Sequence, residues 1–231
     1  VDGIRINQTK KNGTTPLFIS CQGGHLKIVD ALLAGKEIQI NQATNNGATP
    51  LYVACKYDHL KLVNALLAKK EIQINQAKNN GCTPLFIACQ EGRMKVINVL
   101  LERKEIKINQ AMNDGCTPLF IACQEDRMKV VNALLARKEI KINQAMNDKC
   151  TPLFIACQKG RVKVVNVLLT RKEIQINQAM NDGCTPLFMA CQKDRVKVVN
   201  ALLARKEIQL NQANNNGATP LFIACQNDRV K

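Results

Sequence analysis

A repeat of fixed length limits the folds open to this sequence more than any other property does. The segment Thr-Pro-Leu-Phe-Ile-Ala-Cys-Gln at residues 117–124 recurs along the chain with small changes, and each copy contains one proline. The chain has no other proline, so all seven are spaced 34 residues apart: Pro16, Pro50, Pro84, Pro118, Pro152, Pro186 and Pro220. A constant period in this range is typical of arrays in which each unit packs only against its neighbours.

We predict a single repeat array over residues 1–231. Residues 1–10 match the end of a preceding repeat, and residues 215–231 form a partial repeat that stops where earlier units continue into a second helix. Full repeats occupy residues 11–44, 45–78, 79–112, 113–146, 147–180 and 181–214. Neither end has the polar outer face of a capping repeat, so we expect a segment of a longer array.

The repeat at residues 113–146 shows the local structure expected in every copy. It opens with Asn-Asp-Gly, a turn signal, because glycine accepts a positive φ and asparagine and aspartate tolerate it. Thr117 suits a helix N-cap, and Pro118 suits the first helical position, which needs no backbone N–H. Three apolar residues then share one face of a short helix: Leu119, Ala122 and Cys123.

A second helix is predicted after Asp126, which ends the first helix in a slot that holds glycine in other repeats. Its buried stripe consists of Val130, Val131, Leu134 and Leu135. Cations follow near its C-terminus, where the helix dipole favours them. Residues 139–144 alternate in polarity like an extended loop that returns to the next turn. One short helix pair with one hairpin cannot bury a core alone, so the units must stack.

Three parts of this unit resemble the ankyrin repeat: Gly-x-Thr-Pro-Leu-Phe-x-Ala-Cys, Val-Val-x-x-Leu-Leu, and the Ile-Asn before the turn. Tetratricopeptide units share the period, but their tryptophan and Gly-Tyr spacing are missing here. The resemblance implies an all-α, right-handed repeat solenoid, in which helix pairs stack and β-hairpin loops protrude. It also implies a structural role for His25 and His59. Lys149 occupies the turn-glycine slot, where a positive φ would strain it by about 1 kcal/mol.

All eleven cysteines fall into two repeat slots, which argues against disulfides and metal sites. Stacked helices lie about 8–10 Å apart, whereas a disulfide needs Cα atoms within about 7 Å. We therefore expect reduced, unmetallated thiols, with Cys123 and its equivalents buried and Cys116 and its equivalents more exposed beside the turn. Without a signal peptide or a membrane-length apolar run, we expect a cytoplasmic location. No catalytic constellation recurs, so we expect no enzymatic activity and no cofactor.

The formal net charge of +15 leaves two interpretations open. Columns of basic residues run along the second helices at Lys27, Lys61, Lys95, Lys129, Lys163 and Lys197, and at their ends from Lys69 to Arg205. They form either a solvated face or an electrostatic surface for an anionic partner, namely a nucleic acid or an acidic lipid surface. Nucleic acid is disfavoured because no aromatic residues are interleaved to stack bases. We expect no insertion into a membrane.

The slots that vary between repeats indicate where a partner would bind. The resemblance implies recognition on a concave face formed by hairpins and first helices, and hence a non-catalytic protein-interaction scaffold. The middle repeats carry a sulfur-rich apolar strip there, which reflects either function or recent duplication. The alternatives to a protein partner are the anionic partner or a structural spacer, and self-association is also open. The predicted partner-binding residues are Tyr57, Lys78, Met112, Cys116, Glu125, Met146, Cys150, Lys159, Met180, Cys184 and Lys193.

Overall fold

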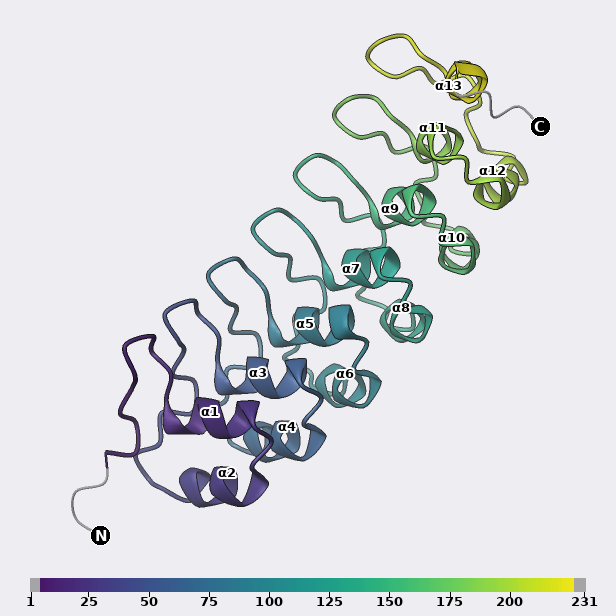
Figure 1. The fold of residues 1–231 in the computed structure, drawn as a ribbon. Coiled ribbons are helices and arrows are strands. Elements are labelled where there is room, and N and C mark those ends of the chain that lie inside the picture. The colour runs from purple at the N-terminus through teal and green to yellow at the C-terminus, as the bar shows by residue number, and fades with distance from the viewer. Residues whose placement is uncertain (1–4, 227–231) are drawn as a thin grey trace. The chain divides into compact units, whose positions relative to one another are not determined.

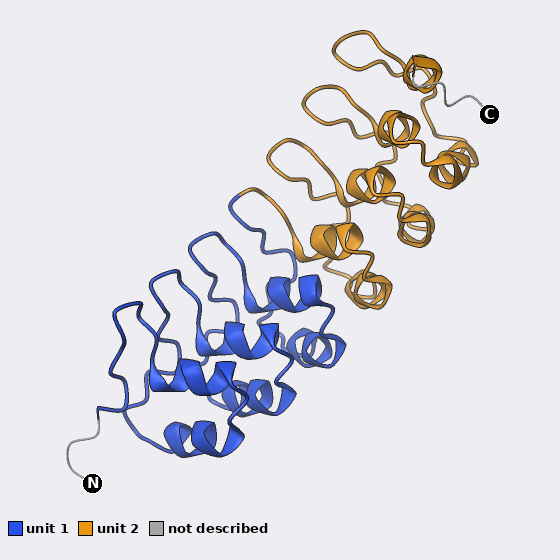
Figure 2. Cartoon of the chain, viewed as in Figure 1, with its two compact units in different colours: residues 1–113 blue, residues 114–231 orange. Residues whose placement is uncertain are grey.

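The computed structural model describes residues 5–226, so the outermost parts of the two partial repeats, residues 1–4 and 227–231, lie outside the described residues. The chain forms two compact units, unit 1 (residues 1–113) and unit 2 (residues 114–231), shown in Figure 2. Over residues 5–226 the regular secondary structure is helical, and no strand is present.

Short first helices alternate with second helices in both units (Figure 1). Unit 1 contains α1 (Pro16–Gln22), α2 (Leu26–Leu33), α3 (Pro50–Lys56), α4 (Leu60–Leu67), α5 (Pro84–Glu91) and α6 (Met94–Leu101). Unit 2 contains α7 (Pro118–Gln124), α8 (Met128–Leu135), α9 (Pro152–Gln158), α10 (Val162–Leu169), α11 (Pro186–Gln192), α12 (Val196–Leu203) and α13 (Pro220–Gln226). The predicted all-α stack of helix pairs is confirmed.

The Thr-Pro pair starts the first helices as predicted. Thr117 is extended (φ −96°, ψ 164°), and its side chain accepts a hydrogen bond from the backbone N–H of Phe120 at 3.1 Å. Pro118 follows at the first helical position. Two residues after the helix, Asp126 has a φ of 56°, a left-handed conformation that ends the helix as expected. Local residues therefore determine where the first helix begins and where it ends.

The core lies between the row of first helices and the row of second helices. Within unit 1, α3 contacts α1, α4 and α5, and within unit 2, α9 contacts α7, α10 and α11. The predicted apolar stripe of α8 is buried, with Val131 and Leu134 fully inaccessible. Burying such a side chain contributes about 1.5–3 kcal/mol, and the same contribution recurs in each repeat.

Each hairpin loop is held by asparagine side-chain hydrogen bonds to the loop of the next repeat, and not by the backbone hydrogen bonds of a β-ladder. Asn143 donates from Nδ2 to the carbonyl of Glu173 at 2.7 Å and accepts from the N–H of Gln175 at 3.0 Å. Asn41 makes the same pair of bonds with Glu71 and Gln73 in unit 1. The predicted β-hairpins are thus hairpin-shaped loops without strands in the described part of the chain, because asparagine side chains satisfy the backbone groups of the next loop.

Candidate functional site

Each hairpin tip is closed by backbone hydrogen bonds that fix the residues on either side of the turn. At the tip formed by residues 146–150, the N–H of Met146 donates to the carbonyl of Cys150 at 2.9 Å. The N–H of Lys149 donates back to the carbonyl of Met146, also at 2.9 Å. Lys149 has a φ of 67°, so this non-glycine residue adopts the left-handed conformation of the turn-glycine slot.

Neighbouring tips are bonded to one another, which sets the tips of unit 2 in a row. The N–H of Asn147 donates to the carbonyl of Asp114 at 2.9 Å, and the N–H of Asn181 donates to that of Asp148 at 3.0 Å. Side-chain amides add a second link, such as Asn215 Nδ2 to the carbonyl of Asn181 at 3.0 Å. Residues on the tips therefore keep a fixed spacing from one repeat to the next.

The predicted sulfur-rich strip is only half correct. Met146 and Met180 in unit 2, and Met112 in unit 1, are partly exposed on the entering arms of their hairpins. The cysteines across the turn, Cys116, Cys150 and Cys184, are buried with 6% exposure each, and Cys82 in unit 1 is buried with 4% exposure. The Cys150 thiol, for example, faces inward, and its Sγ lies 4.0 Å from the backbone carbonyl of the buried Thr151. The expectation that these cysteines are exposed beside the turn is wrong, although Cys116, at 6% exposure, is less completely buried than Cys123, at 0%.

The slot just after the first helix carries the charged residues of the predicted site. Glu125, Lys159 and Lys193 are exposed, and each is the C-cap of its helix. The residue that follows is left-handed in every case, at Asp126, Gly160 and Asp194. The chain turns away directly after the cap, so the charged side chain stays at the surface beside the first helix.

Unit 1 presents a different set of side chains on the equivalent face. Tyr57 occupies the C-cap slot of α3 and is 43% exposed. Lys56 places its Nζ 5.5 Å from the ring centroid of Tyr57, and Lys78 does the same over the buried ring of Tyr52. Sequence reasoning did not select Tyr52 or Lys56. The available signal was that tyrosine replaces phenylalanine, and lysine replaces glutamine, in this repeat alone.

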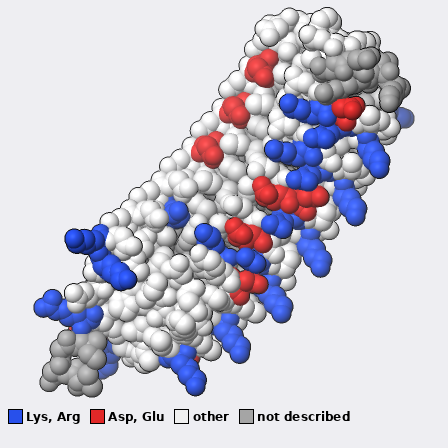
Figure 3. All heavy atoms as spheres, viewed as in Figure 1, with Lys and Arg blue, Asp and Glu red and all other residues white. Residues whose placement is uncertain are grey.

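Three acidic residues on the tips of unit 2 were also absent from the predicted site. Asp114, Asp148 and Asp182 are exposed, and each accepts the N–H of the following cysteine through Oδ1 at 2.8–2.9 Å. Figure 3 shows acidic side chains along the hairpin edge in the part of the view that unit 2 occupies. Unit 1 has asparagine in this slot, at Asn46 and Asn80, so its tips lack this negative charge.

The thiols beside the hairpin tips are poorly suited to chemistry. Burial raises the pKa of the Cys150 thiol to about 12, with the Asp148 carboxylate adding to the effect, and raises the pKa of Cys184 to about 11. Because the thiolate is the nucleophile and the metal ligand, such groups are inert near neutral pH. No group of three or more His, Cys, Asp or Glu residues is placed to hold a metal ion in the described part of the chain.

Many of the basic residues have internal partners. Arg171 donates to the carbonyl of Leu135 at 2.9 Å, and Arg205 donates to that of Leu169 at 2.9 Å, so each caps the second helix of the preceding repeat. His59 Nε2 lies 3.2 Å from the carbonyl of Gln22, in line with the predicted structural role of this slot. In a later repeat, Arg161 in the same slot donates to the carbonyl of Gln124 at 3.2 Å.

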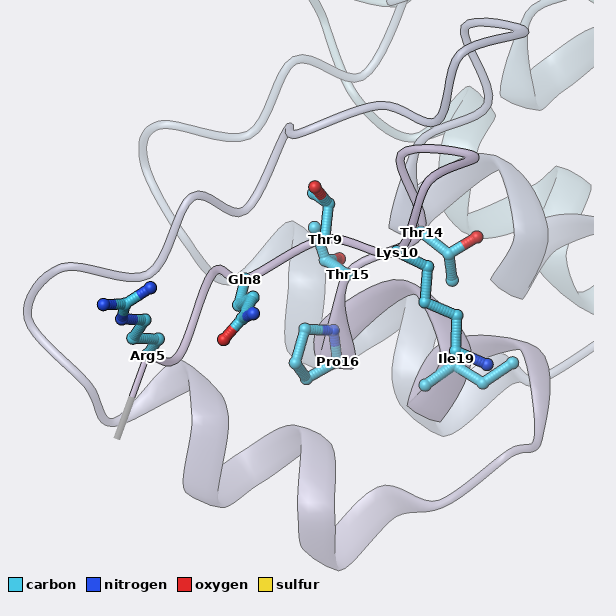
Figure 4. Close-up of a pocket in the computed structure, with 8 residues that line it drawn as sticks. All are labelled: Arg5, Gln8, Thr9, Lys10, Thr14, Thr15, Pro16 and Ile19. Carbon is cyan, nitrogen blue, oxygen red and sulfur yellow. The ribbon is translucent and has the colours of Figure 1, made fainter. Parts of the chain in front are cut away.

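One cavity, of about 460 Å³, lies beside the first hairpin of unit 1 (Figure 4). Arg5 and Lys10 supply its positive charge, and Thr9 and Thr14 supply hydroxyl groups. Ile19 also lines it and is 49% exposed, whereas Val53 at the same slot of the next repeat is 4% exposed. The cavity is therefore formed by the first hairpin together with Pro16 and Ile19 of α1, on a side of the first repeat where these α1 side chains are exposed or partly exposed.

Comparisons with known proteins agree with this geometry. The family described as "Ankyrin repeats (3 copies)" matches in overlapping windows over residues 2–78, 41–112, 69–146, 104–180, 137–214 and 173–231. Among solved structures, the chain is similar to the crystal structure of the human ASB11 ankyrin repeat domain. That similarity has a TM-score of 0.76 and 28% sequence identity, and covers 91% of this chain and 92% of the other.

Two further searches gave negative results. No curated protein matches the sequence significantly. Among residues 5–226, no helix has both the length and the apolar character required to cross a membrane.

Proposed function

Because the chain belongs to the ankyrin repeat family, we propose that it is a non-catalytic scaffold that binds a protein partner through its hairpins and first helices. Ankyrin repeats are generally protein–protein interaction modules. The buried thiols support a reducing, cytoplasmic setting, where such cysteines persist unpaired.

The observation that carries this proposal is the contrast between the constant and the variable slots of the repeat. Core slots repeat the same residues, whereas the entering arm of the hairpin reads Thr44, Lys78, Met112, Met146, Met180 and Asn214. In unit 2, Met146 and Met180 have partly exposed side chains, whereas their backbone N–H and carbonyl groups are hydrogen-bonded across the turn. Methionine is flexible and polarizable, and it suits an apolar partner surface of imperfect shape.

The surroundings of the methionines indicate the chemistry of the partner. On the hairpin tips, Asp148 and Asp182 supply negative charge next to Met146 and Met180. We infer that the partner of unit 2 presents apolar side chains flanked by at least one basic group. On unit 1 we infer a contact through Tyr57, Lys78 and Met112, with Lys78 held over the Tyr52 ring.

Site-specific photo-crosslinking in a cell extract tests the proposal. A benzophenone amino acid replaces Glu125 or Lys159 on the proposed face, and replaces Asn132 or Asn166 on the second helices as matched exposed controls. We expect one set of proteins to crosslink at the first two positions and not at the controls. The same products must disappear when Met146→Asp and Met180→Asp are introduced into the crosslinking chains.

Each of three other outcomes would contradict this proposal. Crosslinks at all four positions that survive the methionine changes would indicate nonspecific capture. Absence of any specific product would favour a structural spacer. A product that contains a second copy of the chain, and that depends on the methionines, would identify self-association as the binding event.

A further inference from the structure

Unit 2 carries a second surface, on the side of its second helices, whose charge the protein-interaction site does not use. Each loop after a second helix contains an arginine, a lysine and a glutamate in succession. The arginine pairs with the glutamate, at 3.2 Å for Arg137 and Glu139 and at 2.7 Å for Arg205 and Glu207. The hydrogen bond from Arg205, with the backbone bond of Glu207, lowers the pKa of that carboxyl. The negative charge of the glutamate is therefore balanced by the arginine. The positive charge of the intervening lysine is left without an acidic partner in the loop.

The second helices add one more lysine each. Lys129 in α8 has Asn132 and Ala136 at spacings of three and seven residues, so the three share one outward stripe. All three are exposed. The equivalent stripes of α10 and α12 begin at Lys163 and Lys197, which are also exposed. The helices α8, α10 and α12 contain no acidic and no aromatic residue.

Six lysines thus form two columns, which we call the lysine face: Lys129, Lys163 and Lys197 on the helices, and Lys138, Lys172 and Lys206 in the loops. All six side chains are exposed, and none of their ammonium groups has an ion pair or hydrogen bond to another residue in the range 5–226. Neighbouring second helices pack about 8–10 Å apart, so the face is a lattice of positive charges at that spacing. Figure 3 shows Lys and Arg side chains projecting one after another along this side.

We propose that the lysine face of unit 2 docks on anionic lipid headgroups at a membrane surface. Clusters of four to eight basic residues are attracted to acidic lipids, and each lysine near the surface strengthens binding about fivefold. Lipids move laterally and can match whatever spacing the repeats impose. Docking of this kind requires no helix that enters the bilayer.

The chemistry of the face favours lipid over nucleic acid. Arginine forks and stacked aromatic rings are what nucleic-acid sites use for phosphates and bases. Here the arginines are already engaged, since Arg171 and Arg205 bind the carbonyls of Leu135 and Leu169. The six lysines of the lysine face have no such side-chain partner among residues 5–226, and lysine is a flexible point charge suited to a fluid, laterally mobile surface.

Unit 1 has a weaker version of the face. Its α2 carries Asp30 where the other second helices have asparagine, and Glu102 follows α6 directly. Both side chains are exposed, and their negative charges offset part of the positive charge of the lysines on the second helices of unit 1. Unit 2 is therefore the part of the chain in which to test the proposal.

The experiment is vesicle co-sedimentation of the whole chain. The vesicles contain phosphatidylcholine mixed with phosphatidylserine, or phosphatidylcholine alone, at low and at high salt. The test variant is Lys163→Ala with Lys197→Ala, and the matched control is Lys159→Ala with Lys193→Ala. Both remove two exposed positive charges from unit 2, but the control removes them beside the first helices. Circular dichroism verifies that both variants fold.

We expect the wild type to sediment with the acidic vesicles alone and to be released by high salt. The test variant should bind about 25-fold more weakly, and the control should bind within about threefold of the wild type. Equal losses in both variants would show that net charge, and not this face, drives binding. No sedimentation at low salt, or tighter binding to duplex DNA than to acidic vesicles under the same conditions, would overturn the proposal.

Discussion

Lys149 shows how one residue disturbs an otherwise regular row of tips. Its φ of 67° is normally occupied by glycine, and at the equivalent Gly115 an added Cβ would lie 2.7 Å from the Cα of Met146. Beside Lys149 the contact from Asn181 Nδ2 to the carbonyl of Asn147 is 3.4 Å, whereas that from Asn215 to Asn181 is 3.0 Å. The extra side chain coincides with the longer of these two links between tips.

We expect Lys149→Gly to raise the free energy of unfolding by about 0.5–1 kcal/mol. Relief of a left-handed conformation is worth about 1–2 kcal/mol, and the added flexibility of glycine in the unfolded chain offsets part of it. Urea denaturation measures the change, with Gly183→Lys as the reverse control, which should lose at least as much. A Lys149→Gly variant that is less stable than the wild type would show that this position is not strained.

The reactivity of the thiols should follow their burial. The expected burial of the equivalents of Cys123 is wrong at two positions, since Cys225 is exposed and Cys191 is intermediate, whereas the remaining nine cysteines are buried. We predict that an alkylating reagent at neutral pH labels Cys225 first and Cys191 second. Cys123, with no exposure, should react more slowly than Cys116, which retains 6%. Mass spectrometry of timed digests gives the order, and labelling of Cys123 as fast as Cys225 would contradict the packing of α7.

The same burial predicts a loss of stability in alkali. The pKa of Cys21 and of Cys150 is raised to about 12 and that of Cys184 to about 11, from an ordinary value of 9.0. A thiol whose pKa is higher in the folded state stabilises the fold fully below pH 9, and this contribution is lost between pH 9 and about 12. Urea unfolding at increasing pH should show the decline. The variant Cys150→Ala with Cys184→Ala should decline less steeply, and an identical slope would argue against this origin.

At the scale of the helices, side-chain hydrogen bonds join each repeat to the preceding one in addition to the packing of the core. Arg171 reaches the carbonyl of Leu135 in the second helix of the preceding repeat, and its side chain is 38% exposed. Hydrogen bonds to charged groups contribute about 1.5–3 kcal/mol, and partial exposure lowers this through solvent screening. We predict that Arg171→Met lowers the free energy of unfolding by about 1 kcal/mol.

Lys172→Met is the matched control for this prediction. Lys172 is the next residue, exposed and without a hydrogen bond among the described residues, so its replacement should change stability by less than about 0.5 kcal/mol. Chemical denaturation of both variants decides the matter. Equal effects would mean that general charge, and not the bond to Leu135, accounts for the loss.

The elements were predictable from sequence because their signals are local. The N-cap at Thr117, the break at Asp126 and the buried stripe of α8 each depend on a few adjacent residues. The exposure of Cys116 was predicted wrongly, because a turn position alone does not show that the thiol packs inward against a buried threonine. The bond between Arg171 and Leu135 spans 36 residues and gave no sequence signal beyond a recurring basic slot.

At the scale of the whole molecule, the net charge of +15 divides into cations with structural partners and cations without them. The lysine face of unit 2 and the hairpin-and-first-helix face draw on different side chains of the same repeats. We therefore expect the two proposed activities to separate by mutation. The lysine-face variant should retain protein binding, and changes at Met146 and Met180 should leave vesicle binding unchanged.

The most direct measurement is the affinity of the crosslinked partner for three forms of the chain by titration calorimetry. The forms are the wild type, Met146→Asp with Met180→Asp, and Lys163→Ala with Lys197→Ala. Two central apolar contacts typically account for a large share of binding energy, so the methionine variant should bind about 30-fold more weakly or worse. The lysine variant should match the wild type. A folded methionine variant that binds its partner as tightly as the wild type would contradict recognition through this face.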